Sequence, residues 1–114
     1  MNHKLINDNV LYGLVTNPGE NGTPLGKYGR MALYHLRDTD PRRFTFLMMT
    51  GVLMGMMHGV DDEATEKVES ITQNLLSRDP VPKTDDVLER ARHLNAKRDI
   101  AEELVINEMV LVPR

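Results

Sequence analysis

The chain has no cysteine and no tryptophan among its 114 residues, and aromatic side chains make up only 4 % of it. Without cysteine it can form no disulfide, no thiolate zinc site and no cysteine nucleophile. A chain free of cysteine suits a reducing compartment, and residues 1–10 lack the apolar stretch of a secretory signal. The sequence therefore predicts a cytoplasmic protein.

A large net charge is also missing. The formal net charge is -3 and the isoelectric point is near 5.8, so the overall field does not favour coating a nucleic acid. The charges are instead segregated along the chain. Residues 27–43 hold five basic and two acidic side chains, whereas residues 61–69 hold five acids and one lysine.

This segregation predicts two contact surfaces of opposite charge. The candidate basic contact surface consists of Lys27, Tyr28, Arg30, Arg37, Arg42 and Arg43. The candidate acidic contact surface consists of Asp61, Asp62, Glu63, Glu66 and Glu69. In the basic set, Tyr28 is expected to stack on a partner or to anchor it.

The composition is otherwise that of an ordinary globular domain. Apolar residues make up 40 % of the chain and charged residues 27 %, and a chain of this length buries roughly two thirds of its unfolded surface. One folded domain is expected. Its β-prone residues 10–15 and the turn formers of 17–24 predict an N-terminal extended arm or short β-hairpin over residues 1–27. Residues 28–114 are predicted to be the helical domain.

Helical patterns begin in residues 28–38, where Met31 and Tyr34 are expected on the buried side, with Leu36 as a further candidate. Asp40 and Pro41 then predict a new helix, because aspartate caps a helix N-terminus and proline is tolerated at the first helical position.

The second helix is predicted to extend over residues 41–58. His58 suits the negative C-terminal end of a helix, and Gly59 can adopt the left-handed conformation of a C-terminal cap.

A third helix should begin with the acidic residues 61–63, which complement the helix dipole. It should stop before the prolines of residues 79–82, and a fourth helix should extend from residue 84 or 85 to about residue 110. The predicted fold class is mainly α, a small bundle of about four helices.

Residues 46–59 read FLMMTGVLMGMMHG. The whole apolar run is shorter than the about 20 residues that a membrane span needs, so no membrane contact is expected. Because the run is apolar all round, its helix should be enclosed by neighbours. Its candidate close-packing glycines are Gly51, Gly55 and Gly59, which lie four residues apart on one face. The helix packed against them belongs either to the same chain or to a second subunit, which leaves a homodimer open.

No set of residues requires an enzymatic explanation, and no catalytic residues, metal or cofactor are expected. The best metal candidate is His58 with Asp61 and Asp62, a group better explained as capping at a helix junction. Residues 26–30, GKYGR, lack the glycine spacing and the Lys-Ser/Thr ending of a phosphate loop. They are better explained as a tight turn that starts a helix.

The order of several short motifs resembles that of a known family. These motifs are PLGKYGRM at residues 24–31, the segment around Gly51, Asn95 with Arg98, and AEELV with EMV at residues 101–110. The sequence resembles the TnpV family, small proteins encoded on bacterial transposons and related mobile elements, although Tyr28 stands where tryptophan is usual. The resemblance implies a mobile-element protein and supplies no catalytic residues.

The sequence therefore predicts a non-enzymatic accessory protein of a mobile genetic element, which binds a protein partner and, in one version, DNA through the basic surface. The alternative hypothesis is an inhibitor of a host defence nuclease, similar to an anti-CRISPR protein. In that case the acidic surface would imitate phosphate charge in a basic cleft.

Overall fold

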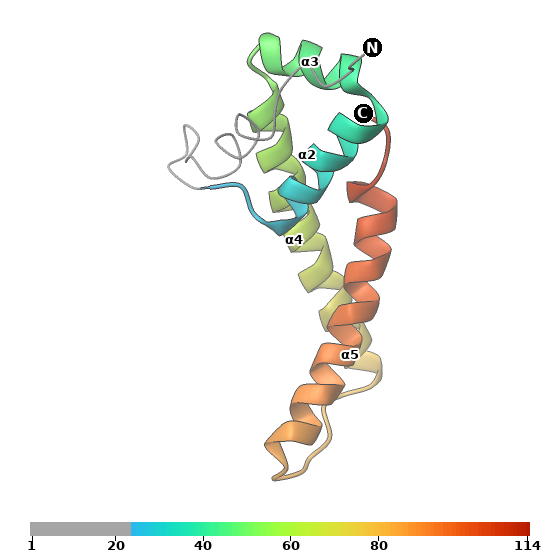
Figure 1. Ribbon diagram of the computed structural model, residues 1–114. Coiled ribbons are helices and arrows are strands. Elements are labelled where there is room, and N and C mark those ends of the chain that lie inside the picture. Colours follow the sequence, from blue (N-terminus) through green and yellow to red (C-terminus); the bar gives the residue numbers. More distant parts are fainter. Residues whose placement is uncertain (1–23) are drawn as a thin grey trace.

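The computed structural model describes residues 24–114, and its regular structure is entirely helical over this range (Figure 1). The four α-helices are α2 (Lys27–Thr39), α3 (Pro41–Met49), α4 (Leu53–Arg78) and α5 (Val87–Val105). A short π-helix, η1 (Ile106–Val110), continues directly from α5. The mainly helical class is thus confirmed, while most of the predicted arm or hairpin lies outside the described residues.

Helix α2 begins and ends where the sequence indicated, but its buried side agrees with the prediction only in part. The buried residues are Tyr28, Gly29, Ala32, Leu33 and Leu36. Tyr34, which was expected in the core, is 38 % exposed. Leu36, the further candidate, is 2 % exposed, and Met31 packs partly buried against the core. The centre of the buried side therefore lies at Ala32 and Leu33 rather than at Tyr34.

Helix α3 starts as predicted. The Asp40 carboxylate accepts a hydrogen bond from the backbone N–H of Arg43 at 3.2 Å, and Pro41 occupies the first helical position. This pairing satisfies one of the free N–H groups of the first turn.

The predicted length of this second helix is wrong, because α3 ends at Met49. Gly51 adopts a φ of 80°, and its N–H donates to the Met48 carbonyl at 3.1 Å. The N–H of Val52 donates to the Leu47 carbonyl at 3.1 Å, which completes a Schellman cap. The left-handed C-terminal cap predicted at Gly59 is therefore formed eight residues earlier, by Gly51. The sequence pattern predicts Gly51 inside the helix.

Helix α4 then runs for 26 residues without a break. His58, Gly59 and the acidic residues 61–63 lie inside it, so the predicted junction near residue 60 is wrong. The sequence carries cap signals at two places in this stretch, Gly51 and Gly59, and the chain uses the one at Gly51. The unbroken α4 packs along α2 and α5 (Figure 1).

The end of α4 and the start of α5 agree with the proline-rich linker. Helix α4 ends at Arg78, and α5 is capped by Asp86, whose carboxylate accepts from the N–H groups of Leu88 and Glu89 at 3.0 and 3.3 Å. The cap lies one residue after the predicted position. At the other end, Arg114 donates to the carbonyls of the last π-helical turn.

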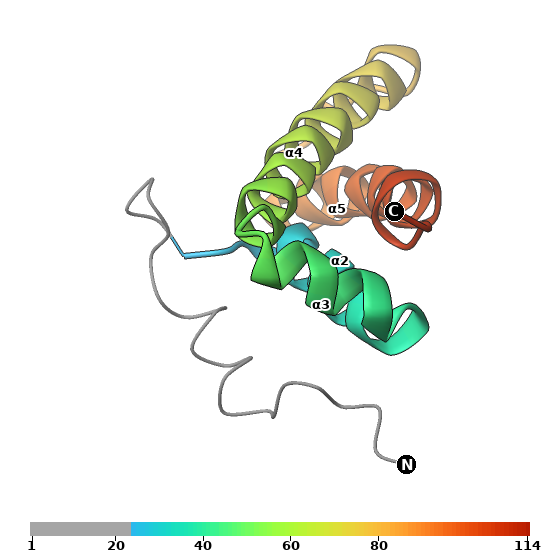
Figure 2. The same ribbon diagram turned by 90° about the horizontal axis from the view of Figure 1, so that it is seen from above.

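The molecule is elongated, with extents of 57 × 27 × 21 Å. A head forms where α2, α3, the first half of α4 and the end of α5 meet, and the rest of α4 and α5 projects from it as an antiparallel two-helix stalk (Figure 1). Viewed from above, α3 turns sharply away from α4 (Figure 2). The largest fully buried side chains belong mostly to the head and include Phe44, Leu33, Leu53, Met57 and Val110.

Candidate interaction surfaces

The start of α2 is held by a side chain from another helix. The Asp61 carboxylate, on α4, accepts from the backbone N–H of Gly26 at 3.0 Å and from that of Gly29 at 3.2 Å. A carboxylate at this position satisfies free N–H groups and complements the positive end of the helix dipole. The GKYG segment is therefore a helix start, as predicted. The negative group at this helix start is the Asp61 carboxylate of the same chain.

Gly26 and Gly29 are the glycines that permit close packing. A Cβ built on Gly26 would meet the Asp61 carboxylate, and one built on Gly29 would lie 2.6 Å from Leu25 Cδ1 and 2.9 Å from the Met57 carbonyl oxygen. The latter contact involves rigid backbone of α4. Any larger residue at position 29 would therefore push α2 away from α4.

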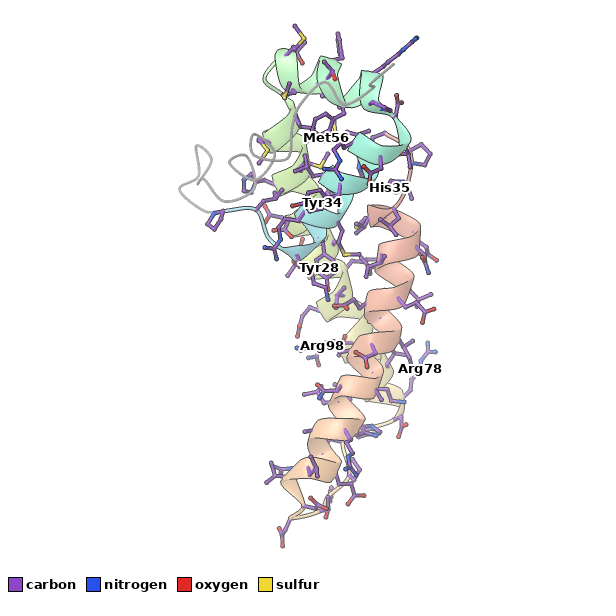
Figure 3. All side chains as sticks on the ribbon, viewed as in Figure 1. Tyr28, Tyr34, His35, Met56, Arg78 and Arg98 are labelled. Atoms are coloured by element: carbon purple, nitrogen blue, oxygen red, sulfur yellow. The ribbon has the colours of Figure 1, made fainter. Side chains whose placement is uncertain are left out.

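The same segment is tied to α5 through Glu102. One carboxylate oxygen of Glu102 accepts from the Tyr28 hydroxyl at 2.7 Å, and the other accepts from Lys27 Nζ at 2.7 Å. Tyr28 lies at the start of α2, on the side toward α5 (Figure 3). Four consecutive residues, the N-cap Gly26 and the first three residues of α2, thus connect α2 with α4 and α5.

These contacts shift two pKa values. Burial, together with the hydrogen bond to Glu102, raises the pKa of Tyr28 to about 12. The hydrogen bonds from Lys27 and then Tyr28 lower the pKa of Glu102. The stabilisation from the Glu102 carboxylate is therefore present above the ordinary pKa of glutamate and is lost as the pH falls through the lowered value.

The candidate basic contact surface is changed by these contacts. Tyr28 is only 8 % exposed, so its ring cannot stack on a partner, and this part of the prediction is wrong. Lys27 is paired with Glu102, and Arg37 donates to Asp38 at 2.8 Å. The predicted basic residues without an ion pair among residues 24–114 are Arg30, Arg42 and Arg43.

The aromatic side chain that the basic side of α2 does expose is Tyr34. The guanidinium of Arg37 lies 5.3 Å from the centre of its ring, and Arg30 precedes it by one helical turn. Figure 3 shows Tyr34 on α2, well separated from Tyr28. The spacing of three and four residues from Lys27 through Arg30 and Tyr34 was the signal that could have identified this residue.

The turn between α3 and α4 exposes large apolar side chains. Phe46 is 56 % exposed, Met49 79 % and Val52 48 %, and these three residues are called the apolar corner below. Arg43 lies over the ring of Phe46, at 5.7 Å from its centre. The described chain therefore encloses only part of this apolar run, including Leu47, Leu53 and Met57. Enclosure of the rest by a second subunit stays a prediction.

The predicted role of Gly51, Gly55 and Gly59 is likewise not fulfilled within the described chain. A Cβ at any of the three would meet no atom within 4 Å. Gly51 serves instead as the left-handed cap of α3. Packing of a second subunit on Gly55 and Gly59 stays a prediction.

The candidate acidic contact surface lies on one continuous helix. Asp62, Glu66 and Glu69 are exposed on α4 at spacings of four and three residues, which places them in one line. Glu63 and Glu66 also line an open groove of about 370 Å³ together with Lys67, Ser70 and Met109. The Asp61 carboxylate is not available to a partner in the same way, because it caps α2.

Helices α3 and α4 have the geometry of a helix-turn-helix, but not its chemistry. They meet at 109° across a short turn that contains glycine. A second helix that reads a DNA groove needs donors and cations in its first turns, whereas α4 begins Leu-Met-Gly-Met-Met and then carries Asp61 and Asp62. The charges of α4 would repel phosphate.

In residues 24–114, no group of three or more histidine, cysteine or acidic side chains could hold a metal ion. No single helix of this range is long and apolar enough to cross a membrane; α3 and α4 pass that test only as a sharply bent pair.

The family described as Transposon-encoded protein TnpV matches this chain over residues 5–110. No curated protein and no solved structure matches it. The match spans nearly the whole chain and includes all five helical elements described above.

Proposed function

This chain belongs to the TnpV family of transposon-encoded proteins, and we propose that it is a non-enzymatic accessory protein that binds a protein partner through the apolar corner. The observation that carries this proposal is the exposure of Phe46, Met49 and Val52 at a single turn. Large apolar side chains grouped at the surface are typical of protein contact sites.

The surroundings of the apolar corner support a partner with acidic groups. Arg42 and Arg43 lie in the first turn of α3, and neither has an ion pair in the described part of the chain. An apolar centre with a charged rim matches the usual anatomy of a protein interface. The flexible side chain of Met49 can adapt to the shape of a partner.

The proposal is tested by capture from a lysate of the bacterial host, with the wild type and a Phe46→Ser/Met49→Ser variant side by side. A Val87→Ser/Leu88→Ser variant is the matched control, because it removes two exposed apolar side chains at the far end of the stalk. A protein retained by the wild type and the control but lost with the corner variant supports the proposal. Equal retention by all three contradicts it.

Nuclease treatment of the same lysate separates a direct protein contact from one bridged by DNA. If DNA is the ligand of Arg30, Arg42 and Arg43, retention is lost after treatment. Binding of a labelled duplex should then weaken steeply between low and moderate salt, because each phosphate contact releases counterions. An affinity for the duplex that does not change with salt concentration would contradict the proposal that these arginines bind DNA.

A second candidate function rests on the unbroken α4. Its line of Asp62, Glu66 and Glu69 supports an inhibitor that occupies the basic cleft of a host defence nuclease. Reversal of all three charges to lysine should abolish inhibition in a nuclease assay with purified enzyme. Inhibition that survives the reversal removes phosphate mimicry as its basis.

A further inference from the structure

The outer face of α3 carries exposed apolar side chains and one unpaired cation. Arg42, Phe46 and Met49 follow one another at spacings of four and three residues, which places them on one side of the helix. All three are exposed, whereas Phe44 and Leu47 of the same helix are buried in the head. Arg42 has no ion pair among residues 24–114. This outer face therefore offers an apolar surface with a positive charge at one end.

The acidic side chains next to α3 in the sequence are already engaged. Asp38 accepts a hydrogen bond from Arg37 at 2.8 Å, and Asp40 accepts one from the backbone N–H of Arg43 at 3.2 Å. Helix α3 itself, PRRFTFLMM, contains two arginines and no acid. Its outer face therefore favours an occupant that brings carboxylates and leaves room for two large apolar side chains.

Helix α4 has an exposed face with these two properties. Gly55, Gly59, Asp62 and Glu66 lie along one line at spacings of four, three and four residues, and all four are exposed. A Cβ built on either glycine would meet no described atom within 4 Å. This face is thus open at its glycines and negative beyond them.

The charge of this α4 face has one sign. Asp62, Glu63 and Glu66 have no ion pair among the described residues. Lys67 is the one lysine or arginine between residues 53 and 77, and it lies to the side of the line, one turn after Glu63. The acidic side chains of the face are therefore available to an external cation.

The two faces match each other when their helices run antiparallel. Residues 42–49 of α3 and residues 55–62 of α4 each span seven positions, about 10 Å along a helix axis. In this orientation Arg42 lies beside Asp62, and the two apolar side chains of α3 lie over the two glycines. A parallel orientation would place Met49 on Asp62 and leave Arg42 over a glycine.

This contact requires two copies of the chain. Helices α3 and α4 of one copy meet at 109° across a short turn, and α3 is directed away from α4 (Figure 2). Two helices held at this angle cannot lie antiparallel along each other. The α3 face of one copy can therefore meet only the α4 face of another.

We propose that the outer face of α3 in one copy docks antiparallel on the exposed face of α4, residues 55–66, in a second copy. The proposal rests on the proposed function, because Phe46 and Met49 belong to the apolar corner, and it names a second copy of this chain as the partner. Two different faces meet in this contact. Each pair therefore leaves one face of each kind free, and the association can continue to longer assemblies.

Sedimentation equilibrium over a range of concentrations tests the association with two complementary variants. Phe46→Glu removes the α3 face and Gly59→Gln fills the α4 face; both positions are exposed, so both variants should keep the fold, which circular dichroism checks. The average mass of the wild type should rise above the chain mass of 13.0 kDa with concentration, whereas each variant alone should stay monomeric. Their equimolar mixture should form a 1:1 pair, because one intact face of each kind remains.

Val87→Glu is the matched control, because Val87 is 67 % exposed at the far end of the stalk, and this variant should associate like the wild type. A wild type that stays monomeric overturns the inference, and so does a mixture of the two complementary variants that forms no pair. A wild type that captures a host protein through the apolar corner yet stays monomeric overturns this inference and leaves the proposed function standing.

A charge exchange tests the antiparallel register. Arg42→Glu and Asp62→Arg should each weaken association several-fold, because each places like charges side by side, and the double variant should recover the affinity of the wild type. Arg90→Glu, which reverses an exposed charge of the stalk, should have little effect. No recovery in the double variant overturns this register.

Discussion

At the scale of single residues, the function of a side chain in this protein follows from where its helix places it. Asp61 and Asp62 are neighbours with the same chemistry, yet only Asp61 reaches the start of α2 and accepts two backbone hydrogen bonds there. The acidic run alone does not distinguish them.

Asp61→Ala should lower the free energy of unfolding by about 1 to 2 kcal/mol, as is usual for the loss of a helix cap. Asp62→Ala is the matched control and should change it by less than about 0.5 kcal/mol, because Asp62 is exposed. Urea denaturation measures both. Equal effects would show that Asp61 does not hold α2.

The raised pKa of Tyr28 predicts how the stability of the fold changes at alkaline pH. Its pKa is about 12 in the folded state and 10.0 ordinarily, so between these values the unfolded chain has lost a proton that the folded chain keeps. The stabilisation is fully present below pH 10 and is lost as the pH rises through 12.

Unfolding of the wild type and of Tyr28→Phe as a function of pH measures this effect. The variant should be less stable at neutral pH by about 1 kcal/mol, because it lacks the hydrogen bond to Glu102. It should also lose less stability than the wild type above pH 10. Parallel pH profiles would contradict the assignment.

At the scale of elements, the conformation of each glycine decides what it contributes. Gly55 and Gly59 lie inside α4 with open space beside them, whereas Gly51 has a φ of 80° at the end of α3. Alanine favours the helical interior by about 1 kcal/mol per site and disfavours the left-handed region by about 1 kcal/mol or more.

Gly55→Ala and Gly59→Ala should therefore each stabilise the protein, and Gly51→Ala should destabilise it, in thermal or urea denaturation. Sedimentation of the same variants distinguishes these effects on stability from the close packing that the sequence predicts at these glycines. If Gly55→Ala or Gly59→Ala instead weakened a dimer, a second subunit would lie in that groove.

At the scale of the whole molecule, burial is uneven between head and stalk. The head joins α2, α3, α4 and the end of α5, whereas the stalk has only two helices (Figure 1). The last fully buried side chain of α4 toward the stalk tip is that of Thr72. Segments with few buried contacts open at lower free energies than the core.

Hydrogen exchange should show this gradient. Amides of residues 74–78 and 88–94 should exchange faster than those of residues 32–36 and 64–68, after correction for intrinsic rates. Uniform protection along α4 and α5 would contradict a head-limited core and would be expected only if a further chain covered the stalk tip.

Signals that act over a few residues were read correctly from the sequence. The cap at Asp40, the proline at position 41 and the linker after Arg78 are where they were predicted. The family resemblance is also confirmed. Most of the predicted basic and acidic residues lie at the surface, and their role as contact surfaces stays a prediction.

The sequence by itself determined the helical class, most helix starts and the order of charges, because these depend on propensities and caps within one or two turns. Only the tertiary structure decided which of two glycines ends α3, that Tyr28 is buried while Tyr34 is exposed, and that Asp61 caps another helix. Those outcomes depend on partners such as Asp61 and Gly26, which are 35 residues apart in the chain. No local pattern encodes a contact at that separation, because it exists only once the start of α2 packs on α4.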